Sequence, residues 1–349
     1  MKKYFSDNEK KISEINILVI SEWYNGFRWH VPQFPPELNN GDFDVMNIPF
    51  LEWPKDFFSI IYHIKNIIKH IEKYDVLILR GNTISTLSFV ILKYLKIVKK
   101  FVVVAEFNTS EKNSSIRSNI KYYIYGKIFN KCELILPFTD IHLKYYEDKL
   151  KLSSRKMVTI PEAVNYLGIN EYPALINCDG DYILSVGRTG RDYMTFCEAI
   201  KDRNDKIIVV SNKKNVDGLE FPANVSILFD IPLDDLLDLV SRAKYIVLPL
   251  KDSIHPVGLR MLFYAMERGK ACIVTNTKTI SEYFSENSPL IVVPPGDSES
   301  LRNAMDFLDS NFDEIRNLGI QSRKLVEKKF TSRNYIVNTY MAIHERYSN

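Results

Sequence analysis

Residues 182–191 read YILSVGRTGR, and this stretch decides the fold that the sequence predicts. Its first five residues are mostly apolar and include β-branched and aromatic side chains, which is typical of a buried strand. Gly187 and Gly190 then allow a tight turn, and a segment of helical periodicity follows from about residue 191. A buried strand, a glycine turn and a helix in this order indicate the first unit of a parallel α/β sheet.

The same alternation continues to the C-terminus. After the first strand, Tyr182–Val186, the apolar runs predict strands at Ile207–Ser211, Val225–Leu228, Tyr245–Pro249, Cys272–Thr275 and Leu290–Val293. The periodic segments between and after them predict helices at about 191–202, 233–242, 257–268, 298–309, 313–329 and 332–347. Continuous apolar strands are covered on both faces, so we expect a doubly wound sheet.

The N-terminal half repeats the pattern. Strands are predicted at Ile15–Ile20, Val76–Leu79, Phe101–Ala105, Leu134–Pro137 and Met157–Ile160, and helices at about 57–73, 83–98, 114–130 and 140–150. We therefore expect an α/β protein of two Rossmann-like domains, 1–165 and 166–330, that face each other across a cleft. Residues 331–349 are expected to form a C-terminal helix that packs back toward the first domain.

The composition is that of a globular protein and excludes several functions. The 349 residues are 46% hydrophobic and 26% charged, close to ordinary values. A net charge of +3 is too small to indicate nucleic-acid binding, although residues 1–165 hold 24 Lys and Arg against 18 Asp and Glu. The first residues lack the apolar core of a signal peptide, and no later run is long enough to span a membrane. We expect a cytoplasmic location.

Residues 187–191, GRTGR, are the strongest candidate for a ligand site. Glycines let the backbone approach a ligand, a helix N-terminus presents free N–H groups, and two arginines can hold phosphate oxygens. This pattern indicates a diphosphate site at Arg188 and Arg191. The alternative is a tight turn whose arginines pair with surface acids. The stretch is neither a P-loop nor the GxGxxG dinucleotide fingerprint.

The motifs downstream resemble the retaining GT-B glycosyltransferases of the group-1 (family-4) type. Gly187-Arg188 follows the first strand of the half, and a helix runs from Gly258 through Ala265-Met266 to Gly269-Lys270. Two further segments follow in the usual family order, Ile280–Tyr283 and Val292–Asp297. The resemblance extends from about Tyr182 to Tyr347, about half of the chain.

The resemblance implies a nucleotide-sugar donor site in this half. Arg188 is expected to bind the diphosphate and Arg191 to replace the second cation of the family. Asp252 and His255 are expected to contact the donor sugar. The remaining expected donor-site residues are Gly187, Gly258, Ile231 as a backbone contact to the base, and Tyr264.

Two glutamates of the family, eight residues apart, are missing. Tyr264 stands at the second position, and the first falls at Pro256 or, with a shift of one residue, at His255. A Tyr hydroxyl can hydrogen-bond a ribose but cannot accept bonds as a carboxylate does. Either donor recognition is rearranged or the donor site has decayed, and the retained arginines favour rearrangement.

The acceptor site is expected at the strand ends of the first half. Polar groups that follow the strands make Glu106 the best carboxylate for orienting an acceptor hydroxyl, with a surface salt bridge as the alternative. The other expected acceptor contacts are Trp23, Arg28, His30, Arg80, Asn82 and Asn108. For Trp23 the alternative is partial burial, and for His30 it is an ordinary loop histidine.

The resulting expectation is a metal-independent glycosyltransferase, with Arg188, Arg191, Glu106 and His255 as its catalytic residues. It would need no cofactor besides the nucleotide sugar, and it would act on a glycan or lipid-linked acceptor in surface polysaccharide or lipopolysaccharide synthesis. The four cysteines form no CxxC pair and there is no DxD motif, so no metal ligand is expected. Basic and aromatic residues of the first half could lie on the inner face of a membrane, and the alternative is a solvated helix face. The alternative function is an inactive relative that acts as a glycan-binding or scaffold subunit.

Overall fold

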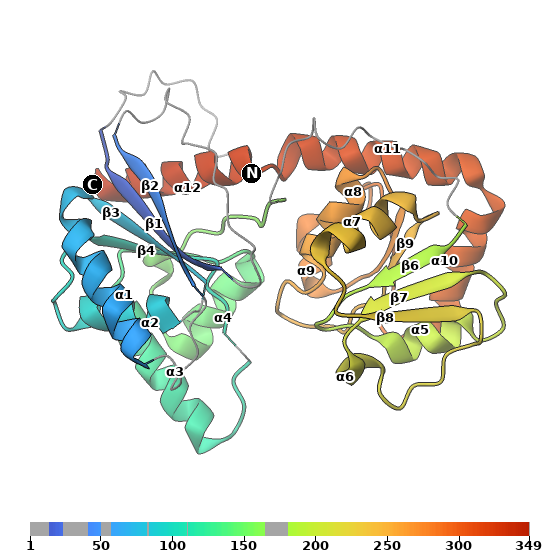
Figure 1. Ribbon diagram of the computed structural model, residues 1–349, viewed down its shortest axis with the longest axis horizontal. Helices are drawn as coiled ribbons and strands as arrows, with labels where there is room; N and C mark the ends of the chain where they lie inside the picture. Colours follow the sequence, from blue (N-terminus) through green and yellow to red (C-terminus); the bar gives the residue numbers. More distant parts are fainter. Residues whose placement is uncertain are drawn as a thin grey trace. The chain divides into compact units, whose positions relative to one another are not determined.

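Two all-parallel sheets organise the chain, one in each of its two units (Figure 1). The computed structural model describes residues 14–23, 41–49, 57–81, 84–109, 111–164 and 181–348. The first unit comprises residues 1–138, 143–160 and 336–349, and the second comprises 139–142 and 161–335. Both sheets carry helices, which confirms the predicted α/β class.

The first unit contains a five-stranded sheet of order β2-β1-β3-β4-β5. Its strands are β1 (Ile17–Trp23), β2 (Phe43–Pro49), β3 (Val76–Arg80), β4 (Phe101–Ala105) and β5 (Leu134–Leu136). Its helices are α1 (Phe57–His70), η1 (Ile71–Lys73), α2 (Ile84–Tyr94), α3 (Ile116–Phe129) and most of α4 (Asp140–Leu150). Since α1, α2 and α3 each connect strands in the same direction across the sheet, the right-handed crossover rule places all three on one face.

The C-terminal helix α12 (Ser332–Tyr347) belongs largely to the first unit. From Ile336 onward its residues group with that unit, and the ring of Tyr347 packs edge-on against Phe101 at the start of β4. The strand β1 and most of α12 therefore belong to the same unit.

The second unit contains a six-stranded sheet of order β11-β10-β9-β6-β7-β8. Its strands are β6 (Ile183–Val186), β7 (Ile207–Ser211), β8 (Val225–Phe229), β9 (Ile246–Leu248), β10 (Cys272–Thr275) and β11 (Ile291–Val293). From β6 the chain adds two strands on one side and then crosses to β9 on the other. The carboxyl ends of β6 and β9 are therefore the switch point, where sheets of this kind bind ligands.

Helices cover both faces of the second sheet, as the apolar strands predict. They are α5 (Tyr193–Ile200), α6 (Lys213–Val216), α7 (Leu233–Arg242), α8 (Leu259–Glu267), α9 (Lys278–Tyr283), α10 (Ser298–Ser310) and α11 (Phe312–Lys329). One core cluster lies beneath α7 and α8, and a separate one lies beneath α5 and α10. Alternate residues of β6 point into each, so Leu184 belongs to the first and Ile183 to the second.

Several short elements differ from the prediction. The sequence analysis did not predict β2, α6 or α9. The strand predicted at Met157–Ile160 is wrong in extent, because its only bridge joins Met157 to Ile135 beside β5. The adjoining residues donate just two backbone hydrogen bonds, from Val158 and Ile160, to the β5 region.

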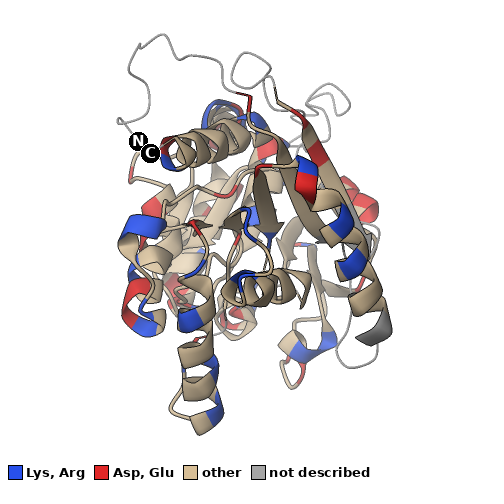
Figure 2. Cartoon of the chain, turned by 90° about the vertical axis from the view of Figure 1, so that its left-hand side faces the viewer, with Lys and Arg blue, Asp and Glu red and all other residues tan. Residues whose placement is uncertain are grey.

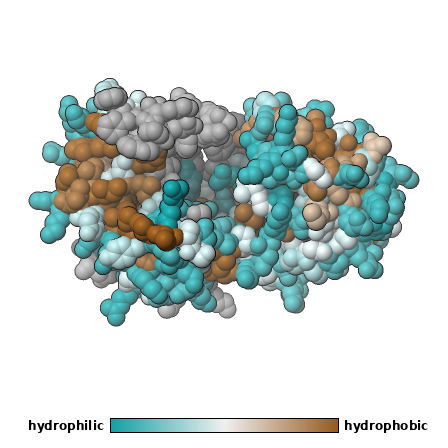
Figure 3. All heavy atoms as spheres, turned by 90° about the horizontal axis from the view of Figure 1, so that it is seen from below, coloured by the Kyte–Doolittle hydropathy of each residue, from teal (hydrophilic) through white to brown (hydrophobic). Residues whose placement is uncertain are grey.

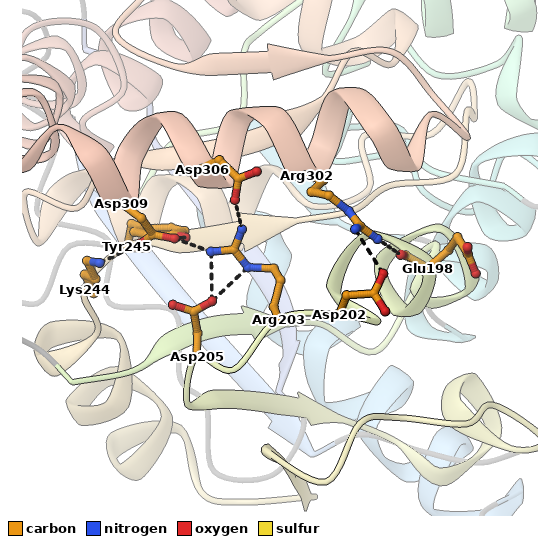
Figure 4. A network of polar contacts seen from close by, with 9 residues as sticks. All are labelled: Glu198, Asp202, Arg203, Asp205, Lys244, Tyr245, Arg302, Asp306 and Asp309. Atoms are coloured by element: carbon orange, nitrogen blue, oxygen red, sulfur yellow. Dashed lines mark hydrogen bonds and ion pairs between the residues drawn. The ribbon is translucent and has the colours of Figure 1, made fainter.

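A network of charged and polar side chains connects α10 to the residues that precede β7 and β9 in the second unit (Figure 4). The Arg203 guanidinium, 9% exposed, donates to Asp205 at 2.8 Å and also contacts Asp306 and Asp309 on α10. Asp309 accepts further bonds from Lys244 at 2.5 Å and from the Tyr245 hydroxyl at 3.2 Å. One arginine thus compensates three carboxylates, one in the loop before β7 and two on α10.

Replacing Arg203 with methionine is expected to lower the free energy of unfolding by about 2–4 kcal/mol, because three carboxylates then lose their shared cation. Arg302 on α10 is a matched control, since its hydrogen bonds to Asp202 and to the Glu198 carbonyl are more exposed. Its methionine variant is expected to lose about 1 kcal/mol or less. Equal losses in urea unfolding of both variants would contradict a special role for Arg203.

Candidate functional site

The loop after β6 forms the centre of the candidate site. Gly187 has φ +148°, and a Cβ there would lie 2.1 Å from the guanidinium of Arg191, so only glycine fits. The Gly187 N–H donates to Val210 at 2.9 Å, and its carbonyl accepts from Ser211 at 3.0 Å and from Tyr193 at 3.2 Å. The turn is therefore fixed to β7 and to α5.

Arg191 lies beneath this loop rather than on it. Its side chain is buried, with Nε donating to the Val186 carbonyl at 2.7 Å and Nη1 to the Thr189 carbonyl at 2.9 Å. Burial lowers the pKa of Arg191 to about 10, so it remains a cation at neutral pH. The expectation that Arg191 presents its guanidinium to a ligand needs correction, because the side chain is buried and its Nε and Nη1 already donate to backbone carbonyls.

Arg188 is the exposed cation of the loop. Its Nη2 lies 3.3 Å from Asp230 Oδ1, and both side chains are at least half exposed. Its backbone is fixed, because the Arg188 carbonyl accepts from Asn212 at 3.0 Å and from Asn215 at 2.7 Å. The sequence analysis did not single out these two asparagines, although their spacing at the start of α6 is a capping pattern.

The loop after β8 supplies the partner of Arg188. Asp230 has φ +48°, a conformation that costs energy for any residue other than glycine and that clusters at functional sites. Ile231, which was expected to contact a base through its backbone, follows directly and packs its side chain partly on the core.

The loops after β6 and β9 are joined at the switch point. Arg191 and Leu250 form an antiparallel bridge, and the Lys251 N–H donates to the Gly190 carbonyl at 2.9 Å. Gly258, which has φ +88° before α8, packs against Leu250, where a Cβ would lie 2.8 Å from that side chain. These contacts bring Gly187, Arg188 and Gly258 together at the carboxyl ends of β6 and β9, as the sequence predicts.

Asp252 and His255 lie in the loop after β9. The Asp252 carboxylate is about half exposed and lies 3.9 Å from the Lys278 ammonium. The His255 N–H donates to Ser253 at 3.0 Å, and its carbonyl accepts from Thr279 at 3.3 Å. Lys278, at the start of α9, was not foreseen because α9 was not predicted.

His255 also meets a buried histidine. His142 groups with the second unit, and its Nε2 lies 3.3 Å from His255 Nδ1. Burial, followed by the charge of His255, lowers the pKa of His142 to about 4. His142 is therefore neutral at physiological pH.

Acidification is expected to destabilise the second unit between pH 6.5 and pH 4. The unfolded chain binds a proton at His142 below pH 6.5, whereas the folded chain does so only near pH 4. The free energy of unfolding therefore falls by about 3 kcal/mol over this range. Urea unfolding at pH 7 and pH 4.5 measures this loss, which His142→Gln should reduce. The exposed His70 provides the control His70→Gln. Equal pH dependence in both variants would argue against this role for His142.

Tyr264 does not lie where its expected role requires. It is 5% exposed within the core cluster of α8, between the buried residues Phe263 and Ala265. Because the Tyr264 side chain is buried in this cluster, a ribose contact by its hydroxyl is withdrawn. Tyr264 is a core residue.

In the first unit, Glu106 and Arg80 form an ion pair at the ends of β4 and β3. Arg80 Nε donates to Glu106 Oε1 at 2.8 Å, and both side chains are mostly buried. Glu106 has φ +56°, like Asp230 in the second unit. A surface salt bridge was the alternative to an acceptor-orienting role for Glu106, and the structure shows a salt bridge. Its side chains are less exposed than those of a surface pair.

The other expected acceptor residues are only partly described. Asn108 is exposed after β4, and the preceding residue is held by a bond of 2.9 Å from Tyr146 to the Phe107 carbonyl. Trp23 ends β1, but its side chain lies outside the described part, as do Arg28, His30 and Asn82. Within the described ranges, no group of three His, Cys, Asp or Glu side chains could hold a metal ion.

Known families and structures resemble both parts of the chain. The family model of the glycosyl transferases group 1 matches residues 182–325. No curated protein sequence matches this chain well enough to count as a relative.

Several solved structures resemble the chain over nearly its whole length. A glycosyltransferase from Rickettsia africae has a TM-score of 0.68 and 16% identity over 96% of this chain and 99% of its own. Anabaena HepE, solved with UDP and glucose, has a TM-score of 0.65 and 12% identity over 96% and 100%. Sucrose-phosphate synthase from Thermosynechococcus elongatus has a TM-score of 0.69 and 13% identity over 95% and 89%. Residues 182–325 therefore match the glycosyl transferases group 1, in a chain whose two-sheet fold is that of the GT-B glycosyltransferases.

Proposed function

We propose that the chain transfers a sugar from a nucleotide-diphosphate donor to a glycan or glycolipid acceptor. The observation that carries this proposal is the exposed Arg188 guanidinium on a fixed glycine turn, at the switch point of a group 1 domain. Such a turn brings backbone N–H groups and one arginine fork together, which is the arrangement that binds phosphate oxygens.

The ion pair with Asp230 is compatible with ligand binding. Both partners are well exposed, so their attraction is weak and a diphosphate can replace the carboxylate. Arg191 adds a fixed positive charge beneath the same loop without touching the ligand. The loop therefore favours a dianionic group over a single carboxylate.

In the proposed reaction the nucleoside diphosphate leaves while negative charge develops on its phosphate oxygens. Arg188 and the loop N–H groups stabilise that charge, and preorganised donors of this kind contribute the largest catalytic effects. Asp252 and His255 hold the sugar, and the backbone at Ile231 contacts the base. Retention of configuration and independence from metal are implied by the family resemblance.

The acceptor is proposed to bind the first unit at the ends of β3 and β4. Arg80 orients the Glu106 carboxylate, which in turn can accept a hydrogen bond from an acceptor hydroxyl. Asn108, together with Trp23, Arg28, His30 and Asn82, completes the proposed surface. A lipid-linked glycan acceptor in surface polysaccharide or lipopolysaccharide synthesis would bring the enzyme to the cytoplasmic face of a membrane.

A thermal-shift screen of the full chain tests the donor proposal. The ligands are UDP, GDP, ADP, CMP and their sugars, with UDP-glucose first because HepE was solved with UDP and glucose. A true donor at 100 times its Kd should add about 2.7 kcal/mol to the stability. Transfer or hydrolysis of the stabilising sugar nucleotide would then be measured directly.

One observation favours a second candidate function, an inactive GT-B relative that binds glycans or acts as a scaffold. The positions of both family glutamates are filled by residues without a carboxylate, and Tyr264 is buried. This alternative predicts no stabilisation by any nucleotide in the screen and no turnover, with glycan binding retained.

A further inference from the structure

The outer face of α3 is apolar although it is exposed. Ile116, Ile120, Tyr123 and Ile124 follow helical spacing on one face and are between 47% and 78% exposed. The opposite face of α3 is buried against the core of the first unit, through Tyr122, Gly126 and Phe129. A helix that is apolar on both faces is expected to have a partner on each.

The C-terminal end of α2 extends this apolar surface. Four large side chains there are 42–58% exposed, namely Ile91, Tyr94, Leu95 and Ile97. Because α2 and α3 pack against each other on the same face of the sheet, their exposed apolar side chains are here taken together as the α2–α3 surface. Figure 3 shows hydrophobic atoms gathered on the first unit. Contiguous exposed apolar areas usually mark interaction sites.

Cations are frequent in the part of the chain that carries the α2–α3 surface. Residues 84–131 hold nine Lys and Arg but only two Asp and Glu, so this part of the chain is strongly basic. Figure 2 shows the basic segments of α3, which carries no acidic residue. Arg117 and Lys127 are exposed on α3, and Lys127 Nζ lies 5.5 Å from the centre of the Tyr123 ring.

We propose that the α2–α3 surface lies on an anionic lipid membrane. Isoleucine side chains can enter the boundary of the acyl chains, while tyrosine and lysine occupy the headgroup level and pair with anionic lipids. No helix in the described part of the chain is long and apolar enough to cross a membrane, which fits a surface contact.

Charge argues against a second copy as the occupant. A two-fold dimer would place the same face of both chains together, so the cations of one would oppose those of the other. A lipid surface of negative charge instead compensates them. The inference deepens the proposed membrane association by naming its surface, and it can be tested without any sugar donor.

Vesicle co-sedimentation of the full chain tests the proposal. The probes are phosphatidylcholine vesicles and vesicles with one quarter phosphatidylglycerol, each at 0.1 M and 0.5 M NaCl. Binding is expected to the anionic vesicles at low salt only, because screening weakens the contribution of the cations.

Two pairs of variants identify the surface. Arg117→Glu with Lys127→Glu should weaken binding about 30-fold or more, since each cation contributes about fivefold at an anionic surface. The matched charge control is Lys328→Glu with Lys329→Glu, on the exposed side of α11. Ile120→Ser with Ile124→Ser should weaken binding at least about tenfold. Its control is Met194→Ser with Phe307→Ser, two exposed apolar residues of the second unit.

The outcomes are distinct. Loss of binding in both α3 variants, with both controls unchanged, supports the proposal. It is overturned if the wild-type chain ignores anionic vesicles, if the controls lose binding equally, or if the α3 isoleucines prove to hold a dimer in solution. Because no donor is present, a negative result leaves the glycosyl transfer untouched, and an inactive enzyme can still bind the vesicles.

Discussion

Replacing Arg188 with alanine is expected to lower kcat/KM for sugar transfer by about 10²–10³, the usual effect of losing one preorganised donor to a developing negative charge. Arg188 is the exposed guanidinium of the loop after β6, and the backbone beneath it is held by two asparagine side chains. The variant should also lose the stabilisation that a nucleoside diphosphate gives to the wild-type chain. Steady-state kinetics and thermal shift measure the two effects.

The fold itself should not depend on Arg188. Among the described residues, Arg188 forms an ion pair only with Asp230, and this exposed contact contributes at most about 1 kcal/mol. The melting temperature without ligand is therefore expected to stay near that of the wild type. Arg316→Ala, on the exposed side of α11, is the control and should retain activity. Normal turnover in Arg188→Ala would refute the diphosphate site.

The sequence predicts the two sheets well because their inner strands are buried on both faces. All four residues of β6 and of β10 are buried, and three of the four in each strand are apolar. The edge strand β2 escaped prediction since it is partly exposed and includes Asp44, whose side chain is half exposed. The apolar run at Met157–Ile160 instead led to a strand prediction that is too long. The pattern of side chains does not reveal whether a neighbouring strand is present to pair with.

The sequence predicts where the loops of the candidate site lie but not the directions of their side chains. Strand ends and glycines place the loops of Gly187 and Gly258 at one edge of the sheet, because this follows from topology. The direction of a side chain depends on the path of the folded loop, and the turn at Gly187 leaves room beneath it that the Arg191 guanidinium fills. Tyr264 likewise faces the core, although its position in the family motif suggested a ligand contact.

Replacing Arg191 with methionine is expected to reduce both stability and turnover, although Arg191 touches no ligand in the proposed mechanism. The variant leaves the Val186 and Thr189 carbonyls without their charged donor, at a cost of about 2–4 kcal/mol for the two hydrogen bonds. Because these bonds shape the loop that carries Arg188, kcat/KM should fall by about 10² or more through misplacement. Urea unfolding and steady-state kinetics measure the two losses.

Arg191→Lys distinguishes the shape of the guanidinium from its charge. A single ammonium keeps the positive charge but lacks the planar fork that serves two carbonyls, so this variant should remain nearly as impaired as Arg191→Met. If lysine restored turnover, charge alone would be the contribution of Arg191 and the loop would not depend on its bonds. Arg188→Lys gives the contrast, since an exposed cation that contacts phosphate can be replaced in part by an ammonium. If Arg191→Lys loses both stability and turnover, the role of Arg191 is to position the loop. If Arg188→Lys loses turnover only, the role of Arg188 is to contact the ligand.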